Sequence, residues 1–509
     1  MPKALKNMTV GVVGAGTMGR GIVQVLAQSG FKVLLHDASG DAVDAAIGFA
    51  AGMLDRAASK GRLDRAVADA AKSRMVPATS LADLAPADIV IEAVIEDLDI
   101  KRDLVGKLDA VLAGTAIIAS NTSSLSITAI AAGSAHPQRV AGLHFFNPVP
   151  LMKVAEVIRA VDTDPAVMEL LVELVRIFGH APVVTSDSPG FVVNHAGRGL
   201  YTEGLRIVQE GVADTVSIDR ILREAAGFRM GPFELLDLTG LDVSYPVMRK
   251  IYEQFWQEPR FRPSPLPALQ VEAGYFGRKT GRGFYVYEDG AIVRPREPDV
   301  PDLKHGGPSR IWLDRSDVSE TTFLDGLRQS LGATVDTGQT PAPDSICVVA
   351  PIGYDATQAA LVAGLDAART VAVDPLLGVT DRLTLMGSPA TAPACRNGAH
   401  ALLAGAGYRV TVIKDSPGFV AQRVLATIIN IACDIAQQGI ASPGDIDLAV
   451  TLGLGYPKGP LAWGDELGAG TVLQMLDRIF ARTGDPRYRA SLWLRRRAEL
   501  RLSLLSKEG

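Results

Sequence analysis

The first third of the chain alternates short apolar runs with an amphipathic segment. The apolar runs have the length of β-strands, and residues 18–30 repeat apolar positions at helical spacing. Such alternation is typical of a doubly wound, mostly parallel sheet flanked by helices. We therefore predict an α/β Rossmann-type domain over residues 1–186. The apolar runs lie at 9–16, 32–38, 87–95, 116–124 and 139–146.

Beyond this region the strand pattern stops and long amphipathic segments follow, such as 194–211 and 217–227. Their spacing of apolar positions predicts an all-α domain over 187–288. Residues 289–310 combine proline, glycine and charged residues without periodicity, which is typical of a linker.

The rest of the chain repeats this order in a reduced form. Strand-like runs at 345–351, 369–376 and 382–387 predict a smaller Rossmann-like domain over 311–414. The helical pattern then returns, which predicts a second all-α domain over 415–509.

The two helical regions are copies of each other. The segment DSPGFV occurs at Asp187 and again at Asp415, an offset of 228 residues. Agreement without gaps over this distance indicates duplication rather than chance. Further identical pairs at this offset are Gly211 and Gly439, Asp219 and Asp447, Gly227 and Gly455, Gly231 and Gly459, Pro232 and Pro460, and Asp237 and Asp465.

Composition narrows the classes of function. The chain has 51 Lys and Arg against 56 Asp and Glu, a net charge of −5 with no long basic run, which argues against nucleic-acid binding. Three widely spaced cysteines form no C-x-x-C pair, which argues against a disulfide scaffold or a zinc site. No export signal and no apolar run of spanning length is visible, so we expect a cytoplasmic protein without a membrane segment.

A glycine-rich turn follows the first apolar run. Its G-x-G-x-x-G spacing places three glycines between a predicted strand and helix, as dinucleotide phosphates require. Asp37 ends the next apolar run, where a carboxylate accepts both ribose hydroxyls and repels a 2′-phosphate. The pattern therefore indicates NAD rather than NADP, although Asp37 also fits a solvated strand end. The expected contacts of the turn are Gly14, Gly16, Thr17, Met18 and Gly19.

Two ionisable groups interrupt the apolar runs further along. His144 ends one predicted strand, and Glu156 shares a strand face with apolar residues in LMKVAEVI. A single histidine is more often structural than catalytic. However, a buried carboxylate is costly without a partner, and a His–Glu pair would remove that cost and orient a general base.

The motifs GAGTMG, SNTSSL, HFFNPVPLMKVAEV, DSPGFVVN and MGPFELLDLTGLD resemble the L-3-hydroxyacyl-CoA dehydrogenase family over residues 8–287. The resemblance implies NAD-dependent oxidation of a 3-hydroxyacyl-CoA, with His144 as base, Glu156 orienting it, and Ser123 and Asn194 contacting substrate. It also implies further NAD contacts from Glu96, Lys101, Ser123, Asn147 and Lys279.

For coenzyme A, the basic residues Arg56, Lys60 and Arg62 follow the second strand, and Lys60 is the expected contact. The serine that family members carry seven residues before this lysine is Met53 here. A solvated helix face explains the three cations nearly as well.

The length and domain order resemble the long family branch that oxidises 3-hydroxyadipyl-CoA in phenylacetate breakdown. Two alternatives remain: a lambda-crystallin-like gulonate dehydrogenase, and a non-catalytic NAD-binding structural or redox-sensing protein. In the second copy Gln422 replaces Asn194, and SNTSSL and HFFNP have no counterpart after residue 300. We therefore expect a catalytically silent second half. It would supply within one chain the partner that short members find in a dimer; a homo-oligomer is the other possibility.

Overall fold

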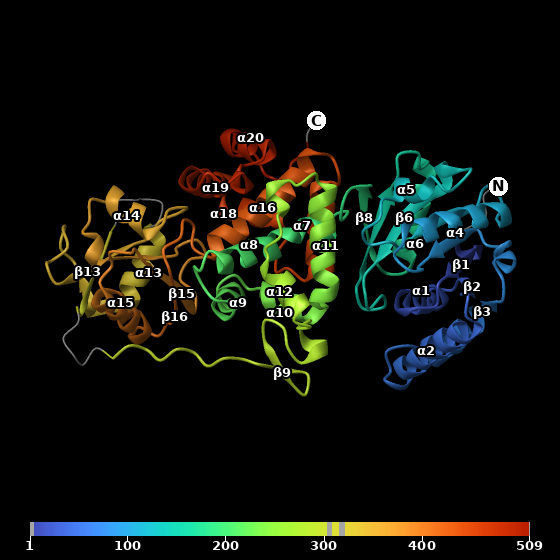
Figure 1. The fold of residues 1–509 in the computed structure, drawn as a ribbon, viewed down its shortest axis with the longest axis horizontal. Helices are drawn as coiled ribbons and strands as arrows, with labels where there is room; N and C mark the ends of the chain where they lie inside the picture. Colours follow the sequence, from blue (N-terminus) through green and yellow to red (C-terminus); the bar gives the residue numbers. More distant parts are fainter. Residues whose placement is uncertain (1–4, 303–307, 315–320, 508–509) are drawn as a thin grey trace. The chain divides into compact units, whose positions relative to one another are not determined.

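The computed structural model describes residues 5–302, 308–314 and 321–507 (Figure 1). The chain forms two compact units. The first unit contains the chain up to His195 together with Gln438–Leu454. The second unit contains Ala196–Gln437 and the chain from Gly455 onward. A short segment of the second helical copy thus belongs to the first unit.

The first unit is built on an eight-stranded sheet with the order β3-β2-β1-β4-β5-β6-β7-β8. All neighbouring strands are parallel except β6 and β7, which are antiparallel. The strands are β1 (Thr9–Val13), β2 (Lys32–His36), β3 (Met75–Ala78), β4 (Ile89–Glu92), β5 (Ile117–Ser120), β6 (Val140–Phe145), β7 (Val154–Arg159) and β8 (Ala181–Ser186).

Helices cover this sheet and bury its apolar side chains in two large clusters. Val12, on β1, belongs to the cluster with α1 and α2, whereas Val13 belongs to the cluster with α4, because successive strand residues point to opposite faces. The helices are α1 (Thr17–Gln28), α2 (Gly40–Ser59), α3 (Arg65–Arg74), α4 (Leu98–Val111), α5 (Ile127–Ala131), α6 (Pro165–Ile177) and α7 (Val193–Ala196).

The helices of the second unit come from both copies. The first copy contributes α8 (Arg198–Gln209), α9 (Thr215–Glu224), α10 (Pro232–Thr239), α11 (Leu241–Gln254) and α12 (Leu266–Glu272), then a hairpin of β9 (Val286–Glu288) and β10 (Ala291–Val293). The second copy contributes α16 (Ala421–Gln437), α18 (Pro460–Leu467), α19 (Ala469–Thr483) and α20 (Leu492–Leu500), while α17 (Pro443–Leu454) lies in the first unit. Helix α8 packs on α16 so closely that a Cβ on Gly199 would lie 3.2 Å from Ile428 Cα.

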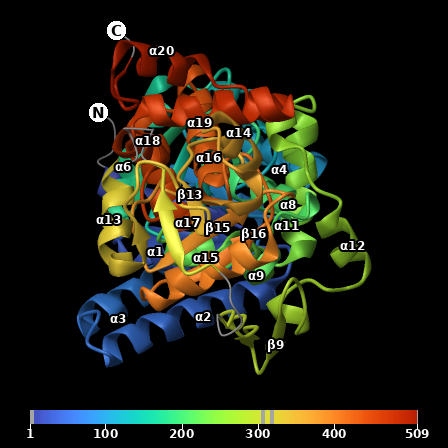
Figure 2. The same cartoon turned by 90° about the vertical axis from the view of Figure 1, so that its left-hand side faces the viewer.

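A six-stranded sheet with the order β12-β11-β13-β14-β15-β16 completes the second unit, and Figure 2 views it with helices around it. Its strands are β11 (Arg310–Leu313), β12 (Val335–Asp336), β13 (Ser345–Val349), β14 (Thr370–Val373), β15 (Arg382–Gly387) and β16 (Arg409–Ile413), and its helices are α13 (Thr321–Leu331), α14 (Ala356–Val362) and α15 (Pro393–Gly405). The predicted fold class, a Rossmann-type domain and an all-α domain followed by a reduced second set, is confirmed.

The same interlocking contact occurs once in each unit. In the first unit, α17 of the second copy packs on β7 and β8, and Ser186 N donates to Ile440 O at 2.8 Å. In the second unit, α9 of the first copy packs on β15, and Lys414 N donates to Val212 O at 2.9 Å. The two hydrogen bonds join equivalent residues, since both pairs of positions differ by the offset of 228. Each sheet is therefore completed by a segment from the other copy.

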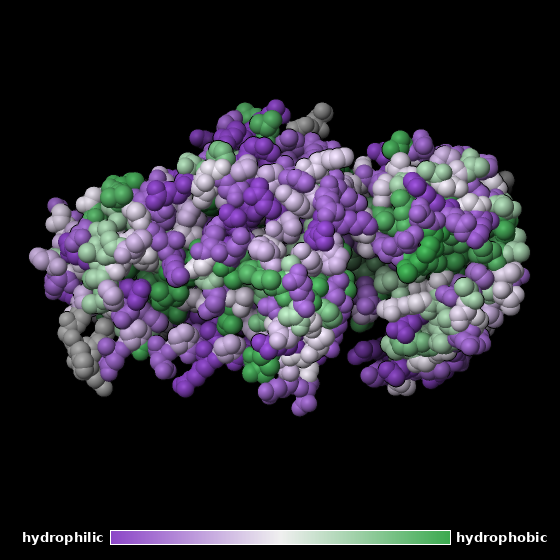
Figure 3. Space-filling model, in the orientation of Figure 1, coloured by the Kyte–Doolittle hydropathy of each residue, from purple (hydrophilic) through white to green (hydrophobic). Residues whose placement is uncertain are grey.

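No helix over the described residues is both long and apolar enough to cross a membrane. On the face drawn in Figure 3, hydrophilic and hydrophobic residues are interspersed over both units.

Candidate active site

The glycine-rich turn joins β1 to α1 in a conformation that requires glycine at positions 14 and 19. Gly14 has a φ of +105°, and a Cβ there would lie 2.5 Å from Ala93 O. A Cβ on Gly19 would lie 1.8 Å from Gly14 O, so any side chain would separate the helix from the turn. A Cβ on Gly16, at the helix N-terminus, would meet no atom within 4 Å. The turn thus offers an open approach to the partly positive end of α1, which suits a pyrophosphate.

Asp37 lies directly beside this turn. It follows β2, and its Oδ2 accepts a hydrogen bond from Ala15 N at 2.8 Å while Oδ1 accepts from Ser39 N at 3.0 Å. The carboxylate is therefore fixed at the carboxyl end of the sheet, next to the phosphate-binding turn. This is where the adenosine ribose of a dinucleotide lies in Rossmann domains, so the residues present fit NAD.

His144 and Glu156 form the pair expected from the sequence. They lie directly opposite each other on the antiparallel strands β6 and β7. His144 Nδ1 lies 2.7 Å from Glu156 Oε2, and the Glu156 side chain is 0% exposed. Because a carboxylate only accepts hydrogen bonds, we infer that Nδ1 carries the hydrogen and Nε2 is left to take a proton.

The repeated segment DSPGF positions this carboxylate. Its turn places Phe191 at a φ of +50°, and the next two residues, Val192 and Val193, donate their backbone N–H groups to Glu156 Oε1 at 2.9 and 2.8 Å. Asp187 holds the start of the turn by accepting from Ser126 Oγ and Thr128 N. Glu156 is consequently held by three donors on two elements.

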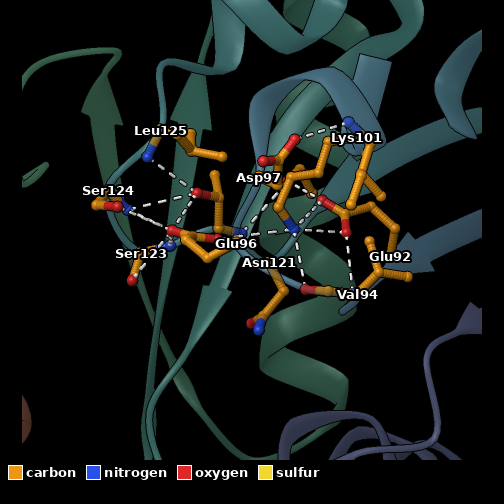
Figure 4. A network of polar contacts seen from close by, with 12 residues as sticks. Glu92, Val94, Glu96, Asp97, Lys101, Asn121, Ser123, Ser124 and Leu125 are labelled. Carbon is orange, nitrogen blue, oxygen red and sulfur yellow. Dashed lines mark hydrogen bonds and ion pairs between the residues drawn. The ribbon is translucent and has the colours of Figure 1, made fainter. Parts of the chain in front are cut away.

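A second carboxylate, Glu96, organises the SNTSSL loop (Figure 4). Its Oε1 accepts from Thr122 Oγ1 at 2.7 Å and from both the backbone and the hydroxyl of Ser123 and Ser124 at 3.0 to 3.2 Å. Burial opposes ionisation of this group, but these donors and Lys101 outweigh it, so the pKa of Glu96 lies below its ordinary value. Ser123 is thereby held in place beside an anion.

Lys101 is almost fully buried, with its amino group 2.7 Å from Glu92 Oε2 and 3.7 Å from Glu96 Oε2. Glu92 ends β4 and also accepts from Ser120 Oγ at the end of β5. Sequence reasoning missed Glu92, although it is the single acidic residue within the apolar stretch 89–95 and therefore carried a signal.

The SNTSSL loop and the histidine strand are tied together by Asn121, whose Oδ1 accepts from Phe145 N at 2.8 Å. Ser123 and His144 therefore belong to one connected part of the first unit, and Asn194 follows the N–H groups that hold Glu156. Lys279 lies in the second unit, where its amino group pairs with Asp242 at 2.5 Å.

A groove with a volume of about 690 Å³ runs beside the turn in the first unit. One wall is a face of α1 and another a face of α2. Residues 147–151, in the loop that follows β6, form one end of the groove. Lys60, Arg56 and Arg62 line it, so the three cations noted in the sequence share one concave surface.

The second copy lacks these groups at the equivalent place. Antiparallel β14 and β15 put Asp374 opposite Thr384, as β6 and β7 put His144 opposite Glu156. Gln422, at the position of Asn194, donates to Asp374 Oδ1 at 2.8 Å and accepts from Gly353 N at 2.7 Å. Asp374, Thr384 and Gln422 thus replace His144, Glu156 and Asn194. The side-chain amide of Gln422 links α16 to the sheet.

A glycine-rich dinucleotide turn, a carboxylate fixed beside it and a buried His–Glu pair on one sheet are the features of an NAD-dependent oxidoreductase. The comparison with known proteins narrows this class. The family model described as the NAD-binding domain of 3-hydroxyacyl-CoA dehydrogenase matches residues 9–188, and the model of the C-terminal domain matches 190–287 and again 418–508. The chain belongs to the 3-hydroxyacyl-CoA dehydrogenase family.

Relatives of two lengths are similar to this chain. A 3-hydroxyadipyl-CoA dehydrogenase of Escherichia coli is 37% identical and covers 97% of this chain and 98% of its own length. A 3-hydroxybutyryl-CoA dehydrogenase of Bradyrhizobium diazoefficiens is 42% identical over 56% of this chain and 98% of its own. Among solved structures, a 3-hydroxybutyryl-CoA dehydrogenase of Escherichia coli K12 aligns over 97% of this chain and 98% of its own with a TM-score of 0.84 and 37% identity.

Proposed function

We propose that His144 is the general base in the NAD-dependent oxidation of an L-3-hydroxyacyl-CoA by this dehydrogenase. The observation that carries the proposal is the 2.7 Å contact between His144 Nδ1 and a fully buried Glu156. Nε2 of His144 takes the proton of the 3-hydroxyl, and Glu156 balances the charge that the imidazole gains. NAD, when bound, accepts the hydride from C3.

Ser123 and Asn194 are proposed to orient the substrate. Each carries a side chain that can hydrogen-bond to the substrate, and a group held in a fixed position keeps the reacting carbon close to its partner. The Glu96 contacts described above fix the backbone of Ser123. Around NAD, we assign contacts to Gly14, Gly16, Thr17, Met18, Gly19, Asp37, Glu96, Lys101, Ser123, Asn147 and Lys279, and a coenzyme A contact to Lys60.

The substitution His144→Ala tests the base. We expect kcat to fall about 10²- to 10⁴-fold for acetoacetyl-CoA reduction, the usual share of general acid–base catalysis, with NADH binding unchanged. His136→Ala is the matched control because its side chain is half exposed at 48% and lies outside the pair. Turnover of His144→Ala within a few-fold of the wild type would contradict the assignment.

For the substrate we propose 3-hydroxyadipyl-CoA or another short to medium acyl-CoA. The support is the full-length similarity to the Escherichia coli relative of that name. The solved full-length structure and the shorter relative from Bradyrhizobium diazoefficiens are named for 3-hydroxybutyryl-CoA. A panel of monocarboxyl and dicarboxyl 3-hydroxyacyl-CoA thioesters, ranked by kcat/KM, tests this. A preference for the monocarboxyl substrate of four carbons would reject the dicarboxyl assignment.

We further propose that the second helical copy acts as a built-in partner and is itself catalytically silent. The support is the packing of α8 on α16 and the replacement of the His–Glu pair by Asp374 and Thr384. We assign the reaction to the cytoplasm, where the three cysteines, which are free and buried, remain reduced.

A further inference from the structure

The groove beside the glycine-rich turn contains a cation that the sequence motifs do not explain. Arg20 lies on the face of α1 that lines the groove, and its guanidinium carbon is 4.0 Å from the centre of the Phe49 ring on α2. Phe49 is 43% exposed and also lines the groove. A guanidinium stacked on a ring is held in one place while the N–H groups along its edge stay available.

The charges around the groove are of one sign. Arg20, Arg56, Lys60 and Arg62 line it, and none of the described lining residues is acidic. Over the described residues, these four cations form no ion pair within 4.0 Å, whereas the neighbouring Arg65 and Lys72 both pair with Asp55 at 2.6 and 2.8 Å. Unpaired cations gathered on one concave surface favour an anionic ligand.

The geometry of the groove matches an acyl-CoA. Asn147 and Leu151 belong to the loop that follows β6, the strand on which His144 lies. The cations Arg56, Lys60 and Arg62 lie at the end of α2 and just beyond it. A thioester that reacts at His144 can therefore extend along the groove and bring its phosphates to the cations.

We propose that Arg20, held against Phe49, is a substrate-binding residue that pairs with a phosphate of the 3′-phospho-ADP group of the acyl-CoA. The proposal rests on the proposed dehydrogenase function of the adjoining site. Arg20 would contact the ligand from α1, opposite Lys60 at the end of α2, so that the ligand is bound between the two helices. Arg20 then sets affinity for the coenzyme A portion and leaves the chemistry at His144 unaffected.

The test uses Arg20→Ala and Arg20→Lys in the full chain, with calorimetric binding of coenzyme A, pantetheine and NADH. We expect Arg20→Ala to weaken coenzyme A binding roughly tenfold or more, the usual effect of losing one charge-assisted hydrogen bond. Pantetheine and NADH should bind as they do to the wild type, because neither meets Arg20. Arg20→Lys keeps the charge but cannot stack as a plane on Phe49, so its affinity for coenzyme A should lie between those of the wild type and Arg20→Ala.

Arg65→Ala is the matched control, since it removes an exposed cation that pairs with Asp55 instead of lining the groove. Unchanged coenzyme A binding in Arg20→Ala, an equal loss in Arg65→Ala, or a loss of NADH affinity instead would each overturn the proposal. Dephospho-coenzyme A, which lacks the 3′-phosphate, identifies the phosphate that Arg20 contacts. If Arg20→Ala also weakens binding of dephospho-coenzyme A, Arg20 contacts the diphosphate. If Arg20→Ala leaves that binding unchanged, Arg20 contacts the 3′-phosphate.

Kinetics separate this proposal from the function it rests on. Arg20→Ala should raise KM for acetoacetyl-CoA while kcat stays within about twofold, and should turn over S-acetoacetyl-pantetheine like the wild type. A wild-type protein that reduces neither thioester would overturn the dehydrogenase function, whereas the binding measurements would still report on Arg20.

Discussion

At the scale of single residues, the carboxylates of this protein differ in what they hold. Glu156 orients a histidine, Glu96 orders a serine loop, and Asp37 fixes the glycine-rich turn through Ala15 N and the start of α2 through Ser39 N. Each accepts several hydrogen bonds, so each is a fixed anion and not a mobile surface charge. Substituting any of them changes both a charge and a local structure, and a test has to separate the two.

Asp37 illustrates this separation. We expect Asp37→Asn to narrow the preference for NAD⁺ over NADP⁺ because it removes the charge that repels a 2′-phosphate, while one oxygen remains to accept a backbone hydrogen bond. Asp37→Ala should narrow the preference and also weaken NAD⁺ binding, because the glycine-rich turn and the start of α2 each lose a hydrogen-bond acceptor. The ratio of kcat/KM for the two cofactors measures this. An unchanged ratio in both variants would show that Asp37 does not read the ribose.

Asp374 makes a pH-dependent contribution to stability. Burial raises its pKa to about 6, against the hydrogen bonds from Gln422 and Leu376 N, and its buried Oδ2 has no partner among the described residues. The folded chain therefore keeps a proton that the unfolded chain loses near pH 4, so stability falls as pH rises from about 4 to 6 and remains lower above.

We expect Asp374→Asn to raise the free energy of unfolding at pH 8 by about 1–2 kcal/mol and to raise it less at pH 5. Thermal unfolding at both pH values measures this difference. Asp381→Asn is a suitable control because that side chain is 91% exposed. An equal effect of Asp374→Asn at both pH values would mean that this carboxyl does not titrate in the window.

At the scale of elements, most strands of the first sheet (β1, β2 and β4 to β7) and the helical copies followed from apolar periodicity and glycine spacing. The His–Glu pairing also followed, because a strand pattern placed Glu156 among buried residues. The Glu96 network did not, since its donors lie on the loop after β5 and only the folded sheet brings that loop to the end of β4. Strands β3, β8, β11, β12 and β16 were not predicted, because their apolar runs are short or interrupted by polar residues.

The contact between α8 and α16 offers a direct measure of how the copies are joined. Arg423 pairs with Glu203 at 2.7 Å, and both are almost fully buried. We expect Arg423→Leu to destabilise the second unit by roughly 3–5 kcal/mol, because it leaves a buried carboxylate without its main partner. The double variant Glu203→Met, Arg423→Leu should recover most of that loss. Denaturant titration measures both, and equal losses in the single and double variants would contradict this account.

At the scale of the whole molecule, the interlocked segments predict that the first half does not stand alone. A chain ending near residue 290 loses α16 from α8 and the segment 438–454 from β8. We expect this fragment to dimerise or aggregate in light scattering, and co-expression of residues 291–509 to restore a one-to-one complex. A fragment that stays monomeric, soluble and fully active would show that the second copy is not a partner.

The proposal that the second copy is catalytically silent predicts the stoichiometry of the cofactor. The full chain should bind one NADH, and Gln422→Asn should leave both this number and kcat unchanged, because no histidine lies opposite Thr384. Equilibrium titration of NADH fluorescence counts the sites. Two NADH molecules per chain would contradict the assignment.

The segment 438–454 also sets an order of events during synthesis. Strand β8 is the edge of the first sheet, and its cover, α17, is translated only after all of the reduced sheet has followed. At typical ribosomal speeds of about 5–20 residues per second, the edge stays open for some tens of seconds. An open edge strand is a template for pairing with other chains. During synthesis, strand β8 is therefore exposed until α17 has been translated. In a short, separately translated subunit, this exposure would end when the subunit met its partner.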